Sequence, residues 1–161
     1  MVVSAGEPVR WQLTDGPEPV IGPADLLVRV VAAGLNRADL LMRRGDYVPD
    51  SADWRVPADR VGFEMAGHVV AVGAQVRGVD VGQPVMAQTG GACAELVAVD
   101  HRSALPVPDA DDLVRAAGRP SGLHAIVDST FGFDDAERAA ARLAEPDSCG
   151  KVVLRHDGAR P

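Results

Sequence analysis

Four polar side chains in the first half of the chain have the chemistry needed for a reaction at a carbonyl group. Asn36 and Tyr47 can donate hydrogen bonds to a carbonyl oxygen, and Asp39 and His68 can move a proton. Histidine ordinarily titrates near neutral pH, and an acidic neighbour on the same strand face can tune it as a general base. We therefore predict that these four residues form the catalytic set.

Each of these residues also has a purely structural interpretation. Asn36 precedes an apolar helical pattern and suits a helix N-cap, and Asp39 suits the reciprocal acid of a capping box. Tyr47 can lie half-buried in a loop, because its ring is apolar and its hydroxyl is polar. His68 can be a solvated residue on the face of a strand. By alternation it shares this face with Glu64, which we expect to be a hydrogen-bonded structural acid. Both interpretations stay open at this point.

Short strands and a few short helices are expected to position these residues. Apolar runs and alternation predict strands over 9–13, 26–33, 61–72, 84–88, 92–99, 124–130 and 151–154. Helices are predicted over 36–44, with Gly45 just after its end, and over 136–144, with Asp134 as N-cap, and a helical turn is predicted within 111–117. The predicted fold class is therefore mainly β with short helices.

Length and composition fit one small domain. The chain has 161 residues, of which 47% are hydrophobic, enough for one core. A net charge of -7 and a pI near 5.0 argue against a nucleic-acid or anionic-membrane partner. No apolar run approaches the ~20 residues that span a bilayer, and the first residues do not resemble a signal peptide. We expect a cytoplasmic protein with a small-molecule substrate.

Several stretches of sequence carry a family resemblance. The string AAGLNRADLLMRRGDY, followed by VGFEMAGHVVAVGAQVRGVDVGQPVMA, resembles the medium-chain dehydrogenase/reductase superfamily. The resemblance is to its zinc-free branch of quinone oxidoreductases and polyketide enoyl reductases. The segments GACAELVAVDHRSALPVPD and IVDSTFGFDDAERAAARLAEPDSCGKVVL continue it. It implies the catalytic domain of that superfamily, a GroES-like, partly open β-barrel.

The chain departs from this family between the last two of these segments. In the family a Rossmann domain that binds the nicotinamide nucleotide lies there, whereas 110–122 offers room only for a linker. No G-x-G-x-x-G motif opens a helix anywhere in the sequence. We therefore expect a single GroES-like domain over 1–161 with the Rossmann domain absent and no cofactor. It would consist of an N-terminal part over 1–109, the linker, and a C-terminal strand, helix and strand over 123–161.

The positions that bind metal in zinc-dependent relatives hold other residues here. Asn36 corresponds to the cysteine after the first strand, and Phe63 replaces the histidine of the G-H-E-x-x-G motif. Asparagine is a poor zinc ligand and phenylalanine is none. Cys93 and Cys149 are too few for the family's four-cysteine structural zinc lobe. We therefore expect no metal site.

The resemblance also implies roles for individual residues. In the family the residue that matches Asn36 faces the nicotinamide and the substrate, and the residue that matches Tyr47 lines the substrate cleft. We expect Trp54, Met42 and Phe63 to bind the substrate.

Three functions are compatible with these observations. The first is a non-redox cyclase or isomerase that reuses the substrate cleft and acts on an unsaturated, polyketide-like intermediate of natural product biosynthesis. The second is a non-catalytic binding or scaffold protein. The third is an NADPH-dependent quinone or enoyl reductase that works with a cofactor domain supplied in trans.

A homodimer is the expected assembly. Loss of a domain uncovers apolar surface, and monomers rarely leave large apolar patches exposed. The segments IVDSTF and KVVL, which belong to the last two predicted strands, would then pair edge to edge with a second copy. The alternative is that the linker over 110–122 covers the uncovered surface.

Overall fold

The fold is mainly β, as the sequence predicted, and it consists of two sheets and short helices. The computed structural model describes residues 2–6, 10–47, 60–108, 112–118 and 125–156. A small antiparallel sheet pairs β1 (Val2–Gly6), which the sequence did not predict, with β2 (Arg10–Thr14). A seven-stranded sheet contains β3 (Asp25–Leu35), β4 (Glu64–Val72), β5 (Pro84–Gln88), β6 (Leu96–Asp100), β7 (Ala104–Pro106), β8 (Val127–Gly132) and β9 (Lys151–Arg155).

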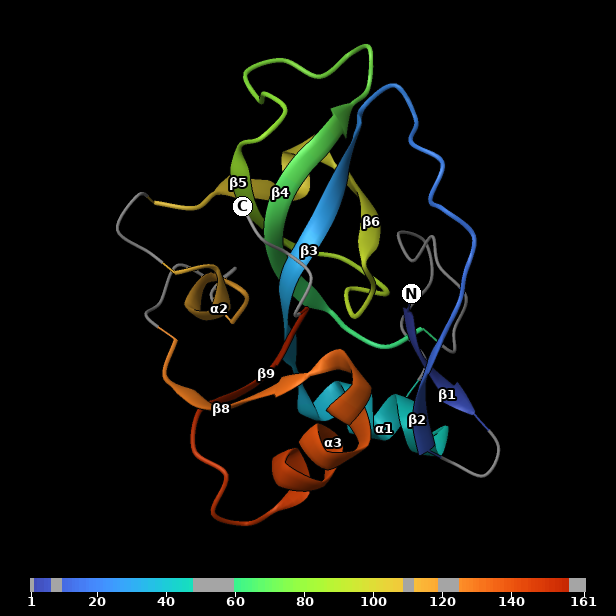
Figure 1. Cartoon of the computed structure of the whole chain (residues 1–161), viewed down its shortest axis with the longest axis vertical. Coiled ribbons are helices and arrows are strands. Elements are labelled where there is room, and N and C mark those ends of the chain that lie inside the picture. Colours follow the sequence, from blue (N-terminus) through green and yellow to red (C-terminus); the bar gives the residue numbers. More distant parts are fainter. Residues whose placement is uncertain (1, 7–9, 48–59, 109–111, 119–124, 157–161) are drawn as a thin grey trace.

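The long strand β3 is the centre of the larger sheet (Figure 1). Across the sheet the order is β7-β5-β4-β3-β9-β8, and β6 pairs with the first half of β3 while β9 pairs with its second half. The strand is a nearly continuous apolar run, which suits a strand that is buried on both faces. Register shifts within the β3–β4 pair bend the sheet. At one of them Gly67 is required, because a Cβ there would lie 2.1 Å from the carbonyl oxygen of Arg29.

The first helix, α1 (Arg37–Arg44), begins and ends as predicted. Asn36 is its N-cap residue, and the Asp39 carboxylate accepts a hydrogen bond of 2.7 Å from the backbone N–H of Asn36. Gly45 follows in the left-handed conformation, with φ 75°, and its N–H donates to the carbonyl of Met42. The helix therefore starts directly where β3 ends, which fixes Asn36 at that end of the strand.

The C-terminal part is a strand–helix–strand unit in which α3 (Ala136–Ala144) connects β8 to β9. The helix has the predicted bounds, but its N-cap is Asp135 and not Asp134. The prediction was wrong by one residue because a 3-10 turn, η2 (Phe133–Asp135), precedes the helix and takes up Asp134. The two strands pair in parallel.

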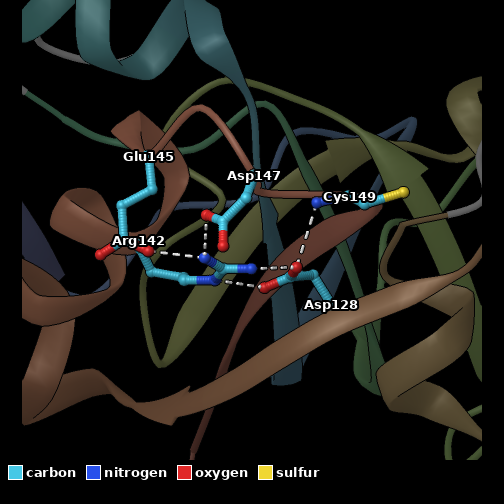
Figure 2. Close-up of polar contacts among 5 residues, drawn as sticks. All are labelled: Asp128, Arg142, Glu145, Asp147 and Cys149. Atoms are coloured by element: carbon cyan, nitrogen blue, oxygen red, sulfur yellow. Dashed lines mark hydrogen bonds and ion pairs between the residues drawn. The ribbon is translucent and has the colours of Figure 1, made fainter.

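A cluster of charged side chains fastens the end of α3 to β8 (Figure 2). Arg142 donates hydrogen bonds to both oxygens of Asp128, at 2.7 and 2.8 Å, and also to Glu145 and Asp147. Asp128 also accepts the backbone N–H of Cys149 at 3.1 Å. These bonds hold the pKa of Asp128 well below its usual range, with Arg142 as the main cause. The cluster thereby fixes the turn that leads into β9.

The strand β9 is not an edge strand, so the prediction that it pairs with a second copy was wrong. It lies between β3 and β8 and pairs with both. Both edges of β9 are therefore hydrogen-bonded within the chain, and neither can pair with a second copy. The sequence alone did not reveal that the second half of β3 pairs with one of these edges. In the described sheet, β8 is the outer strand on this side.

The linker forms a short helix, α2 (Leu113–Ala116), that packs on the sheet. Ala116 and Ala117 are fully buried against Ala32 of β3, Ala66 of β4 and their neighbours Met86 and Val153. Small alanine side chains on both surfaces let the helix approach the sheet closely. The described part of the linker thus covers one face of the sheet, in line with the alternative to dimerisation. No helix in the described part of the chain is both long and apolar enough to cross a membrane.

Candidate functional site

A groove of about 1210 Å³ is lined by β6 and reaches both ends of the neighbouring strand β3. Asp25 and Asn36, which stand at opposite ends of the strand, both line it. Its wall contains both apolar and polar side chains, including Tyr47, Phe63, Glu64, Thr89, Val97 and Val99. A concave surface with a few converging polar groups is the usual form of a small-molecule site.

Three polar side chains meet at the Asn36 end of the groove. Lys151 Nζ lies 2.5 Å from Glu64 Oε1 and 2.6 Å from Asn36 Oδ1. Asn36 Nδ2 in turn donates a hydrogen bond of 3.0 Å to Glu64 Oε1. The three residues come from the end of β3, the start of β4 and the start of β9, so the register of the sheet brings them together.

Glu64 is buried, and its position depends on a glycine across the strand pair. Its exposed fraction is 4%, so its charge needs the Lys151 ammonium to offset the loss of water. Gly34 is paired with Glu64, and a Cβ at Gly34 would lie 2.7 Å from Glu64 Oε1 and 2.8 Å from the carbonyl oxygen of Ala117. The absence of a side chain at Gly34 therefore gives Glu64 its space.

Asp39 lies beside the groove but does not line it in the structure. It is buried, and its two oxygens accept the backbone N–H groups of Asn36 at 2.7 Å and Gly62 at 2.8 Å. Burial raises the pKa of Asp39 to about 7, although the two backbone hydrogen bonds act in the opposite direction. Both oxygens are used to hold backbone, which favours the capping interpretation of Asp39 over a role as the base.

Tyr47 and Phe63 form an aromatic wall of the groove next to Asn36. Their ring centroids are 6.1 Å apart with an interplanar angle of 53°. Tyr47 is 40% exposed, which leaves much of its surface accessible to a ligand. The structure thus brings together three of the predicted site residues, Asn36, Tyr47 and Phe63.

Other predicted residues lie away from this end of the groove. His68 is four positions beyond Glu64 on β4, opposite Arg29 and Pro84, and its Nδ1 is 3.4 Å from the carbonyl of Gly82. His68 does not line the groove, and neither does Met42 of α1. Trp54 lies outside the described residues. The predicted pairing of His68 with the acid Glu64 is not made, because Glu64 begins β4 and His68 lies four positions further on, in the middle of the strand.

Lys151 was not among the predicted site residues, and Glu64 was expected to be structural only. One signal was available, because Lys151 is the only lysine in a chain that otherwise uses arginine for its long basic side chains. An ammonium differs from a guanidinium in that it is a compact point charge and can fit beside a single buried carboxylate. The lone lysine was therefore informative about the site.

The N-terminus of α3 does not suit a pyrophosphate group. In dinucleotide sites the pyrophosphate binds at the positive N-terminus of a helix that connects two parallel strands. The helix α3 is such a helix here, because it connects the parallel strands β8 and β9. Asp134, Asp135 and Glu137 stand there instead and would repel phosphate. The residues described here also contain no group of three histidine, cysteine or acidic side chains placed to hold a metal ion.

Comparisons with known proteins point to one family. Residues 22–109 match the model of the alcohol dehydrogenase GroES-like domain. The chain is 38% identical over 141 residues to mouse prostaglandin reductase-3, covering 87% of this chain and 33% of that protein. It is 40% identical over 82 residues to a phenolphthiocerol/phthiocerol polyketide synthase of Mycobacterium tuberculosis, covering 51% of this chain and 4% of that protein.

A solved structure agrees in fold. The human synaptic vesicle membrane protein VAT-1 homolog-like protein superposes with a TM-score of 0.83 at 16% identity, covering 99% of this chain and 98% of that chain. The first curated relatives are longer, and the chain spans about a quarter of their length.

Proposed function

The chain belongs to the alcohol dehydrogenase GroES-like domain family of the medium-chain dehydrogenase/reductase superfamily, and on that premise we propose that it is a cofactor-independent cyclase or isomerase. Its substrate is an unsaturated carbonyl compound of polyketide type. The observation that carries the proposal is the contact among Asn36, Glu64 and Lys151 at the end of the groove, beside Tyr47.

In this proposal Asn36 and Tyr47 polarise the substrate carbonyl. An asparagine amide has two N–H donors, and Glu64 accepts one of them, which leaves one for a ligand. Lys151 fixes the orientation of the Asn36 amide. Its ammonium donates to Asn36 Oδ1, so the amide oxygen faces Lys151 and the NH₂ group faces away from it. A donor held in place before the substrate arrives stabilises the developing enolate oxygen at low cost.

Glu64 carries the proton in this proposal, in the role that sequence reasoning gave to Asp39 or His68. In a cyclisation by conjugate addition, a hydroxyl oxygen of the substrate bonds to the β-carbon while Glu64 takes its proton. The C=C electron pair moves onto the carbonyl, and the enolate that forms then receives the same proton at the α-carbon. Isomerisation uses the same pair of proton transfers at two carbons. Neither reaction needs an electron donor.

The substrate class is supported by the relatives and by the groove. One relative is a polyketide synthase. The groove follows β6 and has Val97 and Val99 in its wall, so it suits an extended chain with an apolar body. Binding such a chain in a bent form would bring its reacting atoms together.

Incubation without any nucleotide tests this function. A panel of hydroxylated α,β-unsaturated thioesters would be mixed with the purified protein and followed by liquid chromatography with mass detection. Cyclic or isomeric products of unchanged mass are expected in H₂O, and in D₂O the cyclic product would carry one deuterium at the α-carbon, because the substrate hydroxyl exchanges with the solvent. Glu64→Gln should abolish the reaction. No conversion of any member would overturn the proposal.

A reductase that uses a nucleotide domain from another polypeptide is a second candidate. It is favoured by the relatives named as reductases. The same panel distinguishes the two candidates, because a reductase would give products two mass units heavier and only when NADPH and a partner domain are added.

A further inference from the structure

We propose that the groove binds the anionic end of its ligand at Arg60, an inference that rests on the proposed function and specifies the substrate further. Arg60 lines the groove. Its Nη1 atom is buried and has no hydrogen-bond partner among the described residues. Buried guanidinium groups are normally paired, because the loss of water around an unpaired charge is expensive.

The loop that follows β2 closes over this guanidinium. A Cβ at Gly16 would lie 3.1 Å from both Nη1 and Nη2 of Arg60, so the guanidinium lies directly against the glycine backbone. The next residues of the loop, from Pro17 to Val20, line the groove. Arg60 is therefore held at the wall of the groove by a loop that offers it packing but no acceptor for Nη1.

The other basic groups at this groove already have acidic partners. Arg102 makes two hydrogen bonds to the Asp100 carboxylate, of 2.9 and 2.6 Å. Lys151 is paired with Glu64. Of the two arginines that line the groove, Arg60 is thus the one with a buried donor still to be satisfied.

The matching ligand group is a planar or tetrahedral oxyanion. The guanidinium fork pairs with two oxygens of a carboxylate or a phosphate, with stronger hydrogen bonds than neutral groups make. In a polyketide-type substrate this group is either the free carboxylate of the chain or the phosphate of a phosphopantetheine arm that carries it. Both have the same chemistry toward Arg60.

Calorimetric titration with two matched pairs of probes tests the inference. The first pair is 2,4-hexadienoate and its methyl ester, and the second is 4′-phosphopantetheine and pantetheine. The charged member of at least one pair should bind about 10- to 100-fold more tightly than its neutral counterpart. Arg60→Gln should remove that preference and leave the affinity for the neutral member unchanged, and Arg60→Lys should retain part of it.

Arg102→Gln is the matched control, because it removes a guanidinium from the same groove that already has a carboxylate partner. It should keep the preference for the charged probe. Whichever pair shows the preference identifies the source of the oxyanion. Equal affinity for both members of both pairs overturns the Arg60 inference alone, whereas no binding by any of the four probes overturns the inference and the proposed function together. Circular dichroism of each variant separates loss of the preference from loss of the fold.

Discussion

Lys151 Nζ and Glu64 Oε1 are 2.5 Å apart although 87 positions separate the two residues in the sequence. The first residue of β9 and the first residue of β4 meet there across the end of β3. A buried carboxylate is thereby kept beside its counter-ion at the groove. We expect both the stability of the fold and the proposed reaction to depend on this pair, and mutation of either residue tests this.

Replacing the lysine should cost stability as well as activity. Lys151→Met leaves Glu64 buried without its ammonium partner, so the free energy of unfolding should fall by about 1–3 kcal/mol. Urea denaturation at pH 7 measures this change. The double variant Glu64→Gln with Lys151→Met should recover part of the loss, because the uncompensated charge is gone. If the two single changes simply add, the pair is not coupled.

Asp39 should make the protein less stable as the pH rises. Its folded-state pKa of about 7 lies above the ordinary value of 3.8, so the folded state holds a proton that the unfolded state has released between these values. The contribution of Asp39 is complete below pH 3.8 and is lost as the pH rises to about 7. Urea denaturation of the wild type and of Asp39→Asn from pH 4 to 8 should show a difference in the free energy of unfolding that becomes smaller as the pH rises. Asp46→Asn, which removes a carboxylate at an exposed site, is the control variant.

A side chain at Gly34 should displace the site. Gly34→Ala would place a Cβ 2.7 Å from Glu64 Oε1 and 2.8 Å from the Ala117 carbonyl oxygen, and strained packing of this kind costs about 1–3 kcal/mol. Thermal denaturation should show the loss, and product formation in the nucleotide-free assay should fall with it. Gly45→Ala is the comparison, because its new Cβ would meet nothing within 4 Å and only the left-handed backbone is strained. It should lose stability but keep activity. Equal effects of both changes on activity would contradict the role of Gly34.

We also propose that the chain is a homodimer formed through β8. This strand is the outer strand of the described sheet on its side, and Ile126 beside it is 71% exposed. Light scattering should return twice the chain mass of 16.8 kDa. Thr130→Pro in the exposed part of β8 should lower the measured mass toward the monomer. A monomeric mass for the wild type would instead mean that α2 covers enough of the sheet for the chain to stand alone.

Local features of the fold could be predicted from the sequence because local chemistry determines them. The α1 bounds follow from the capping residues Asn36 and Asp39 and the terminating Gly45, and those of α3 from its alanine-rich pattern. The strand β1 was not predicted, because its only partner in the described sheets is β2 and nothing in its own five residues requires that pairing. Likewise the sequence could not place β9 in the interior of the sheet, since that depends on the far half of β3.

The site could be predicted only in part for the same reason. Asn36, Tyr47 and Phe63 lie within one stretch of sequence, and they meet at the groove. Lys151 reaches them only through the pairing of β9 with β3, a long-range contact that no spacing reveals. His68 shares a strand face with Glu64, but four residues of strand, about 13 Å, separate the two positions. Periodicity therefore identified candidates, and the register of the sheet selected among them.

The pairing of β9 with β3 also cannot form until the ribosome has synthesised β9, long after β3. Asn36 and Lys151 are 115 positions apart, so at roughly 5–20 residues per second the second half of β3 waits roughly 6–23 s for its partner strand. Through that interval the nascent chain carries an unpaired apolar strand edge, the kind of surface that chaperones bind and that aggregates when it is left open. Truncated translation products should therefore lack the site and be prone to aggregation.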